Sequence, residues 1–206
     1  MAKKAKKLGR LNLKEMRGLI NKKAGIEIAH SLSEENPTNV RRWIPTGSRW
    51  LDSIICKGKL AGIPLGKVVE IAGQESTGKS YMAAQVAANA QKMGIDVVYF
   101  DSESAIDSAF LEKTGCFLDD DPPEGMGWFM YTQAYSVETV LETIEELLGT
   151  NDNSMLFIWD SVAQTPCSTD IEGDFKQHRR GDDHTLVHTR RQSAAIYLFF
   201  EDVVDL

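Results

Sequence analysis

The chain has 206 residues, of which 42% are hydrophobic and 26% are charged, which is ordinary for a globular protein. No run approaches the roughly 20 apolar residues of a membrane span, so we expect no membrane contact. A net charge of −7 excludes a protein built throughout to bind polyanions, and contact with nucleic acid would need a local basic patch. The three cysteines lack metal-ligand spacing, which indicates reduced thiols in a cytoplasmic protein.

Residues 1–41 are predicted to form a basic amino-terminal arm that contains a helix. Over the first 23 residues, Glu15 is the single acid among the basic side chains Lys3, Lys4, Lys6, Lys7, Arg10, Lys14, Arg17, Lys22 and Lys23. Residues 11–24 place leucine, methionine and isoleucine side chains at helical spacing, which predicts an amphipathic helix. The arm is either a solvated extension or an element that docks on a neighbouring subunit or touches phosphates.

A strand, a glycine-containing loop and a helix are predicted next. Residues 31–66 hold three prolines and are expected to connect elements. The run Lys67–Ala72 is rich in β-branched residues, which is typical of a buried parallel strand. Lys79–Met93 contains neither glycine nor proline and stops before Gly94, which predicts a helix.

The loop between them has the uninterrupted pattern G-x-x-x-x-G-K-[ST], in which glycines let backbone N–H groups point at phosphate oxygens. In this pattern Lys79 reaches the β- and γ-phosphates of a nucleotide, and the Ser80 hydroxyl ligates Mg²⁺. The strand-loop-helix context favours this interpretation over a surface loop that merely holds glycines. The predicted nucleotide-binding residues are Gly73, Gln74, Glu75, Ser76, Thr77, Gly78, Lys79 and Ser80.

Further strands and helices are predicted to alternate along the rest of the chain. Strands are expected at residues 95–100, 128–131 and 155–159, and helices at 105–113 and 137–148, with an acidic surface excursion at 119–127. This alternation predicts an α/β fold of the P-loop NTPase class, with a mostly parallel sheet flanked by helices. Ligands of such sheets bind at the carboxyl ends of the strands.

Three acidic residues follow predicted strands at that edge. Asp160 ends an apolar strand about 80 residues after Lys79, where P-loop enzymes place the acid that holds Mg²⁺, often through water; the alternative is an ordinary loop acid. Asp101 and Glu103 follow the second strand, and an acid there can deprotonate the water that attacks the γ-phosphate. The spacing does not distinguish between Asp101 and Glu103.

Four blocks of sequence resemble the core of RecA-type DNA recombinases, in the family's order. They are the stretches 46–52, 62–80, 99–107 and 158–163, the last continuing into 170–174. The resemblance covers roughly residues 42–175, which we take as the ATP-binding core. The wording of the blocks and the modest size suggest a bacteriophage-like member, which would work in the cytoplasm of a bacterial host.

The resemblance implies roles for individual residues. Glu103 matches the catalytic glutamate, Asp160 the acid on the Mg²⁺ side, and Ser161 its neighbour beside the nucleotide. Asp107 matches the acid that contacts the adenine amino group, and Phe110 the aromatic ring that stacks on the base. Glu172 and Gly173 match the start of the first mobile DNA-binding loop.

The resemblance also implies a function and its partners. Such proteins polymerise on single-stranded DNA as ATP-dependent helical filaments and exchange strands in homologous recombination and repair. The expected cofactors are ATP and Mg²⁺. A second hypothesis is a nucleotide-binding protein that joins or caps filaments of full-length recombinase subunits without strand exchange of its own.

Residues 176–206 are expected to form a divergent tail, because the family's later features, an Asn-Gln pair after a strand and a second DNA loop, are not recognisable there. Three explanations stay open. The tail belongs to a truncated or frame-shifted recombinase, to a shortened natural variant in which residues 194–206 supply a replacement strand or helix, or to a separate binding element. Without a replacement strand, we expect an unpaired sheet edge beyond Asp160.

Overall fold

The computed structural model describes residues 11–31, 40–172 and 194–201. The chain divides into two compact units, residues 1–40 and 41–206. No helix within the described ranges is long and apolar enough to cross a membrane. The cysteines at positions 56, 116 and 167 are free thiols.

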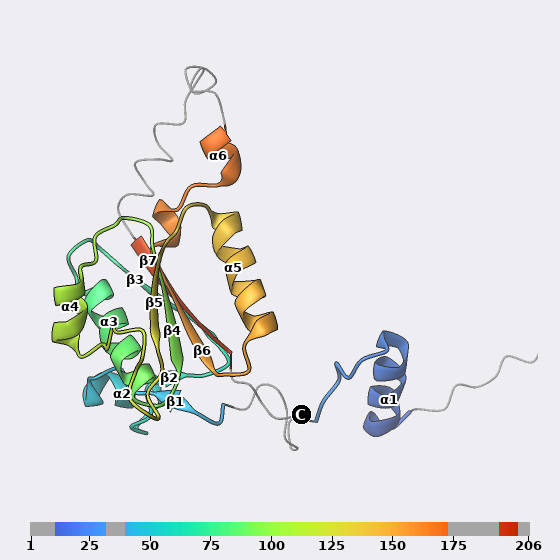
Figure 1. Ribbon diagram of the computed structural model, residues 1–206. Coiled ribbons are helices and arrows are strands. Elements are labelled where there is room, and N and C mark those ends of the chain that lie inside the picture. Colours follow the sequence, from blue (N-terminus) through green and yellow to red (C-terminus); the bar gives the residue numbers. More distant parts are fainter. Residues whose placement is uncertain (1–10, 32–39, 173–193, 202–206) are drawn as a thin grey trace, which may run out of the picture. The chain divides into compact units, whose positions relative to one another are not determined.

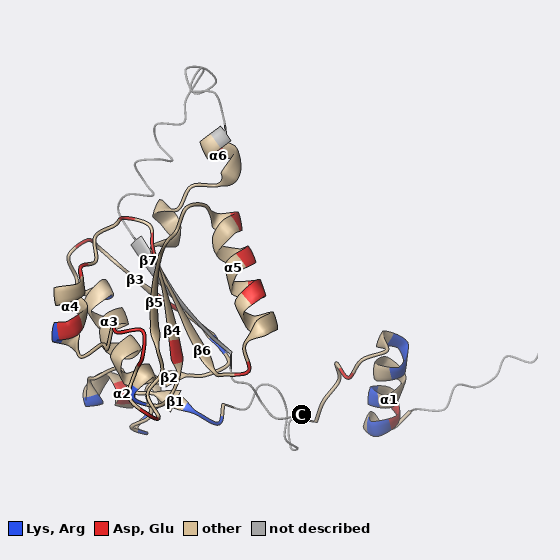
Figure 2. Ribbon diagram, viewed as in Figure 1, with Lys and Arg blue, Asp and Glu red and all other residues tan. Residues whose placement is uncertain are grey.

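The first unit contains helix α1 (Leu13–Ala24), which confirms the helix predicted in the arm. Asn12 and Glu15 form a reciprocal capping box at its start, and Gly25 ends it in the left-handed conformation. Lys22 and Lys23 lie in the last turn, where cations interact favourably with the helix dipole. No residue of α1 is buried, and the positions of Lys and Arg along it are blue in Figure 2. Among the described residues, the helix therefore exposes its apolar face.

The second unit is an α/β domain, as predicted. Its strands are β1 (Trp43–Ile44), β2 (Ile63–Pro64), β3 (Val68–Gly73), β4 (Asp96–Asp101), β5 (Phe129–Gln133), β6 (Met155–Asp160) and β7 (Ala194–Glu201). Its helices are α2 (Arg49–Ile55), α3 (Lys79–Gln91), α4 (Ser108–Thr114), α5 (Val137–Thr150), the 3-10 turn η1 (Val162–Gln164) and α6 (Ser168–Glu172). Strands β1 and β2 form a small antiparallel pair, and the other five form one sheet in the order β3-β7-β6-β4-β5.

Alternating side chains divide the core into two layers, one on each face of the sheet (Figure 1). On one face, Val97 and Tyr99 of β4 and Ile158 of β6 pack with the alanine-rich side of α3. On the other face, Phe100 and Phe157 pack with the apolar side of α5. Because both faces of β4 and β6 are covered, these strands read as continuous apolar runs rather than alternating ones.

The strand that leads into the phosphate loop differs from the prediction. Lys67–Ala72 was expected to form a buried parallel strand, but β3 is an edge strand whose residues are alternately exposed and half-buried. Its hydrogen-bonded neighbour is β7, which runs antiparallel to both β3 and β6. The β-branched residues of this segment therefore favoured a strand, but they did not determine its position in the sheet.

Strand β7 lies inside the predicted tail, so this tail contributes a strand to the sheet. Residues 194–201 pair with Met155–Trp159 on one side and with Val68–Gly73 on the other. A strand within residues 194–206 is thus present at 194–201, while the origin of the tail as a truncated gene product, a shortened natural variant or a separate binding element stays a prediction. Consequently β6 is paired on both edges, and the open edge expected in the absence of a replacement strand does not occur. Residues 176–193 of the tail lie outside the described ranges.

Candidate functional site

The loop between β3 and α3 has the backbone geometry of a phosphate cradle. Gly78 has φ 88° and forms the N-cap of α3, and Ser76 also has a positive φ, of 58°. Such values are costly for a residue with a Cβ, so Ser76 is held in a strained conformation of the kind that clusters at ligand sites. All five residues from 74 to 78 are exposed. Their N–H groups and the positive end of α3 are therefore accessible to an anion.

The ammonium group of Lys79 bridges the start of this loop. Its Nζ donates hydrogen bonds to the carbonyl oxygens of Gly73, at 3.1 Å, and Gln74, at 2.8 Å. The Thr77 hydroxyl donates to the same Gln74 oxygen at 2.8 Å. These bonds fix the curvature of the loop and hold a positive charge at its mouth, where it can interact with phosphate oxygens.

The loop helix and the end of β6 are joined by one short contact. The Ser80 hydroxyl donates a hydrogen bond of 2.6 Å to Oδ2 of Asp160, and the Tyr99 hydroxyl donates one of 2.8 Å to the same oxygen. Ser80 and Asp160 are 80 residues apart in the chain, so the fold itself brings together the two predicted metal ligands. Tyr99 reaches the carboxylate from β4, two residues before that strand ends.

Glu103 follows β4 on a loop that is tied to both strand ends. Oδ1 and Oδ2 of Asp101 accept hydrogen bonds from the backbone N–H groups of Glu103, at 2.9 Å, and Ile106, at 3.3 Å. The Ser102 hydroxyl accepts the N–H of Ser161 at 2.8 Å and lies 3.2 Å from the carbonyl oxygen of Asp160. The loop that carries Glu103 is thereby fastened to the strand that carries Asp160.

The pKa of Glu103 is raised above that of an ordinary glutamate. Partial burial is the main cause, and the negative charges of Asp160, Asp101 and Glu75 add to it, while the charge of Lys79 acts in the opposite direction. These interactions place Glu103 within electrostatic range of the phosphate loop and of Asp160. A carboxylate whose affinity for a proton is increased in this way is suited to act as a general base.

The remaining predicted nucleotide residues are placed as follows. Oδ1 of Asp107 accepts the backbone N–H of Phe110 at 2.7 Å, so Asp107 is the N-cap of α4, and the helix begins at Ser108 rather than at residue 105. The ring of Phe110 packs edge-on against that of Tyr81, with centroids 6.3 Å apart. Ser161 is fully buried, and its hydroxyl has no hydrogen-bond partner among the described residues. Their contacts with a nucleotide stay predictions.

The two residues predicted for DNA binding lie at the end of the described core. Glu172 is the last residue of α6, and Gly173 lies outside the described ranges. The prediction of a DNA-binding loop that begins here therefore stays a prediction.

The donor set fits a nucleotide with Mg²⁺. The hydroxyl of Ser80 and the carboxylate of Asp160 are hard oxygen donors in direct contact. Within the described ranges there is no cluster of three or more His, Cys, Asp or Glu side chains that could hold a metal ion alone. Mg²⁺ is commonly bound by one or two protein oxygens together with phosphate and water, so a sparse site beside a phosphate cradle agrees with that preference.

Sequence reasoning missed two residues of this site, Tyr99 and Ser102. Tyr99 lies in an apolar strand and was counted as part of that strand, although its hydroxyl reaches Asp160. Ser102 stands between two acidic residues and carries no pattern of its own, although it ties the two strand ends together. The signal that the sequence offered was the hydroxyl of Tyr99 in an otherwise apolar run. A buried tyrosine hydroxyl needs a hydrogen-bond partner, so this residue could have been expected to contact a polar group.

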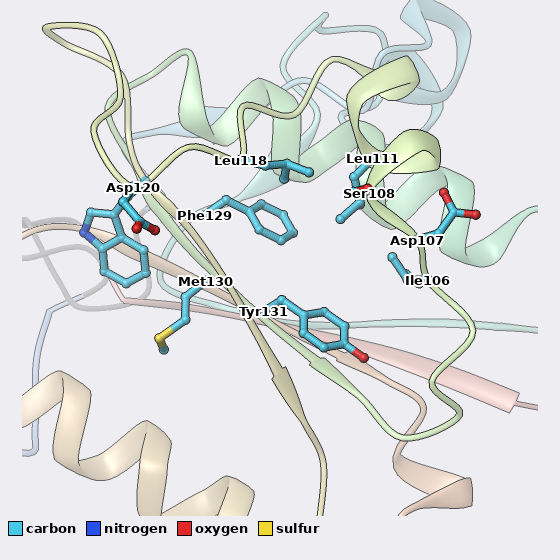
Figure 3. Close-up of a pocket in the computed structure, with 10 residues that line it drawn as sticks. Ile106, Asp107, Ser108, Leu111, Leu118, Asp120, Phe129, Met130 and Tyr131 are labelled. Carbon is cyan, nitrogen blue, oxygen red and sulfur yellow. The ribbon is translucent and has the colours of Figure 1, made fainter.

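A hollow lies between α4 and β5 (Figure 3). It has a volume of about 670 Å³. Apolar residues dominate its lining, among them Leu111, Leu118 and Phe129, and the lining also includes Asp107 and Asp120. It lies beside β5, which is an edge strand of the sheet.

Comparison with known proteins gives a consistent result. The chain matches the RecA N-terminal domain family over residues 12–197, a wider stretch than the 42–175 on which the resemblance was based. It is 33% identical to Protein RecA of Chlamydia pneumoniae over 177 residues, which cover 86% of this chain and 45% of that protein. It is 36% identical to Protein RecA of Geobacter sulfurreducens over 153 residues, covering 74% and 40% of the two chains. The chain therefore spans less than half the length of these relatives.

Proposed function

Because the chain belongs to the RecA N-terminal domain family, we propose that it is an ATP-dependent DNA recombinase core. In this proposal it binds Mg²⁺ and ATP at the loop 73–80, associates with single-stranded DNA as a filament, and hydrolyses ATP for recombination and repair. The observation that carries the proposal is the 2.6 Å contact between Ser80 and Asp160, which joins the phosphate cradle to a strand-end carboxylate. In P-loop enzymes a hydroxyl of the phosphate loop and a strand-end carboxylate hold Mg²⁺ together, and this pairing supports the proposal.

The chemistry assigned to the residues follows from their positions. Lys79 stabilises the negative charge that develops on the phosphate oxygens, and the exposed N–H groups of the loop hold those oxygens in place. Ser80 and Asp160 hold Mg²⁺, which supplies further charge neutralisation when bound. Glu103 takes a proton from the attacking water, which becomes bonded to the γ-phosphorus as the bond to ADP breaks.

Two features support assembly into a homo-oligomer. Helix α1 exposes an apolar stripe that includes Leu13, Met16 and Leu19, with exposed fractions of 67, 45 and 55%. The hollow between α4 and β5 offers an apolar lining that includes the acidic residue Asp120, whose charge complements a basic helix. We assign the hollow to the arm of a second copy of this chain, as expected for a filament.

The test of the proposed activity is ATP turnover with and without single-stranded DNA. We expect turnover that DNA accelerates and that Lys79→Ala abolishes, because the substitution removes the cation at the phosphates. Lys92→Ala, at the far end of α3, is the matched control and leaves turnover unchanged. Turnover that DNA does not affect would contradict the recombinase assignment. Nucleotide binding without turnover, together with co-sedimentation with a complete recombinase, would instead indicate a filament-joining protein.

The proposed assembly has its own test. Leu19→Glu places a charge in the apolar stripe of α1 without disturbing a core, since no residue of this helix is buried. We expect self-association, measured by sedimentation velocity, to weaken by about tenfold or more, as for the loss of a central apolar contact. Glu27→Gln, outside the helix, serves as the control. Unchanged self-association in Leu19→Glu would exclude α1 as the docking element.

A further inference from the structure

The Tyr99 side chain lies on the face of β4 that packs against α3, and its hydroxyl donates a hydrogen bond to the carboxylate of Asp160 at the end of β6. We propose that Tyr99 is a positioning residue, which holds the carboxylate of Asp160 in the orientation that receives Mg²⁺. The inference rests on the proposed function, since it concerns the same metal site. It adds a residue that the phosphate-loop pattern does not contain.

The tyrosine ring is held rigidly. It is fully buried, and it stacks on Phe129 with ring centroids 6.2 Å apart. Val97, Leu156 and Ile158 belong to the same apolar cluster, so the ring has little room to change rotamer. A side chain fixed along its whole length presents its hydroxyl at one position, and that position is 2.8 Å from Asp160 Oδ2.

The hydrogen bonds of Asp160 show how Tyr99 would fix the orientation of its carboxylate. Ser80 and Tyr99 both donate to Oδ2, from α3 and β4 respectively. Two donors that approach one oxygen from different elements fix the plane of the carboxylate. This arrangement leaves Oδ1 to accept from a water molecule in the shell of the metal. Without Tyr99, Ser80 would be the one donor among the described residues that orients the carboxylate, and Ser80 is itself a proposed ligand.

The hydroxyl of Tyr99 remains a donor under all conditions of interest. Burial raises its pKa far above that of an ordinary tyrosine, and the neighbouring charge of Asp160 adds to the effect.

The experiment compares Tyr99→Phe with the matched control Tyr135→Phe, which removes a hydroxyl from an exposed ring. Binding of a non-hydrolysable ATP analogue is measured by calorimetry over a range of Mg²⁺ concentrations. For Tyr99→Phe we expect the Mg²⁺ concentration at half-maximal binding to rise about tenfold, the usual effect of losing a hydrogen bond to a charged group. Binding without Mg²⁺ should stay unchanged in both variants.

A double-mutant cycle with Asp160→Asn separates positioning from a general loss of packing. If Tyr99 acts through Asp160, then adding Tyr99→Phe to Asp160→Asn causes no further change in the Mg²⁺ requirement. Equal Mg²⁺ requirements of Tyr99→Phe and the original protein would overturn the inference and leave the proposed function intact. A Mg²⁺ requirement that rises equally in both backgrounds would overturn it too. Absence of Mg²⁺-dependent binding in the original protein would instead refute the proposed function, and the inference with it.

Discussion

Asp101 and Asp160 are register partners at the ends of adjacent parallel strands, yet their carboxylates have different uses. Both oxygens of Asp101 accept backbone N–H groups of the loop that follows, Oδ2 also accepts the Tyr131 hydroxyl at 3.2 Å, and the residue is only 2% exposed. The carboxylate of Asp160 accepts hydroxyl groups and is half-buried. Asp101 therefore builds the loop that carries Glu103. This supports Glu103, rather than Asp101, as the general base.

Replacing Glu103 with glutamine should separate binding from hydrolysis. The amide cannot accept the proton of the attacking water, so we expect ATP turnover to fall by about 10²–10⁴-fold while nucleotide affinity is retained. Glu112→Gln, on the exposed side of α4, is the control and should behave as the original protein. Steady-state turnover and calorimetric binding measure the two quantities. A parallel loss of both would indicate that Glu103 supports the fold of the site rather than the chemistry.

The raised pKa of Glu103 predicts the pH dependence of turnover. Glu103 must be ionised to act as a base, so turnover should fall, as the pH is lowered, at a higher pH than an ordinary glutamate would give. Glu75→Gln removes one of the charges that raise this pKa, and we expect the acid limb to move to lower pH. Glu70→Gln, an exposed residue of β3, should leave the limb in place. An acid limb that stays fixed in Glu75→Gln would contradict this account.

Asp107 carries two roles that substitution can separate. Asparagine caps helices as well as aspartate does, so Asp107→Asn should preserve stability, whereas Asp107→Ala should cost about 1 kcal/mol through loss of the N-cap. If Asp107 also contacts the adenine amino group, Asp107→Asn reduces the preference for ATP over GTP. Thermal unfolding and competition binding measure the two effects. Retained discrimination in Asp107→Asn would leave Asp107 with the capping role alone.

Gln91 is a structural polar residue whose loss should be costly. Its fully buried amide donates to the carbonyl oxygens of Phe117 and Gly127 and accepts the N–H of Phe117. Gln91→Leu keeps the volume but leaves three backbone groups without partners, so we expect a loss of about 2–4 kcal/mol in the free energy of unfolding. Chemical denaturation measures it, with the exposed Gln164→Leu as the control. A loss below about 1 kcal/mol would mean that water satisfies these groups.

The sequence predicted those parts of the molecule in which local pattern and chemistry agree. The phosphate loop, the helix after it and the strand ending at Asp160 each carry a short-range signal, and the helix and the strand are confirmed as α3 and β6. The contact between Ser80 and Asp160 was predicted as a shared role and is present as a hydrogen bond. A residue's place along a sheet depends on distant partners, so the edge position of β3 was not predictable from its own residues.

Other features were missed because one side chain can serve either packing or chemistry. Tyr99 fits the continuous apolar run of β4, and its neighbours along the chain do not indicate its partner 61 residues away. Asp107 matched a base-contacting acid by resemblance. Its role as the N-cap was not predicted, because the helix was expected to begin three residues earlier. Such double roles emerge only when the distance between side chains is known.

The position of β7 has a consequence for the order in which this protein can assemble. In the described part of the sheet, β3 is hydrogen-bonded to β7 alone, and β7 comes more than a hundred residues later in the chain. Strand β3, which leads into the phosphate loop, therefore cannot be joined through β7 to β6, which carries Asp160, until residue 201 has been synthesised. Pairing over such a separation is slow. A nascent chain that ended before residue 194 would contain every proposed residue of the nucleotide site. It would still lack β7, the strand that joins β3 to β6 by backbone hydrogen bonds.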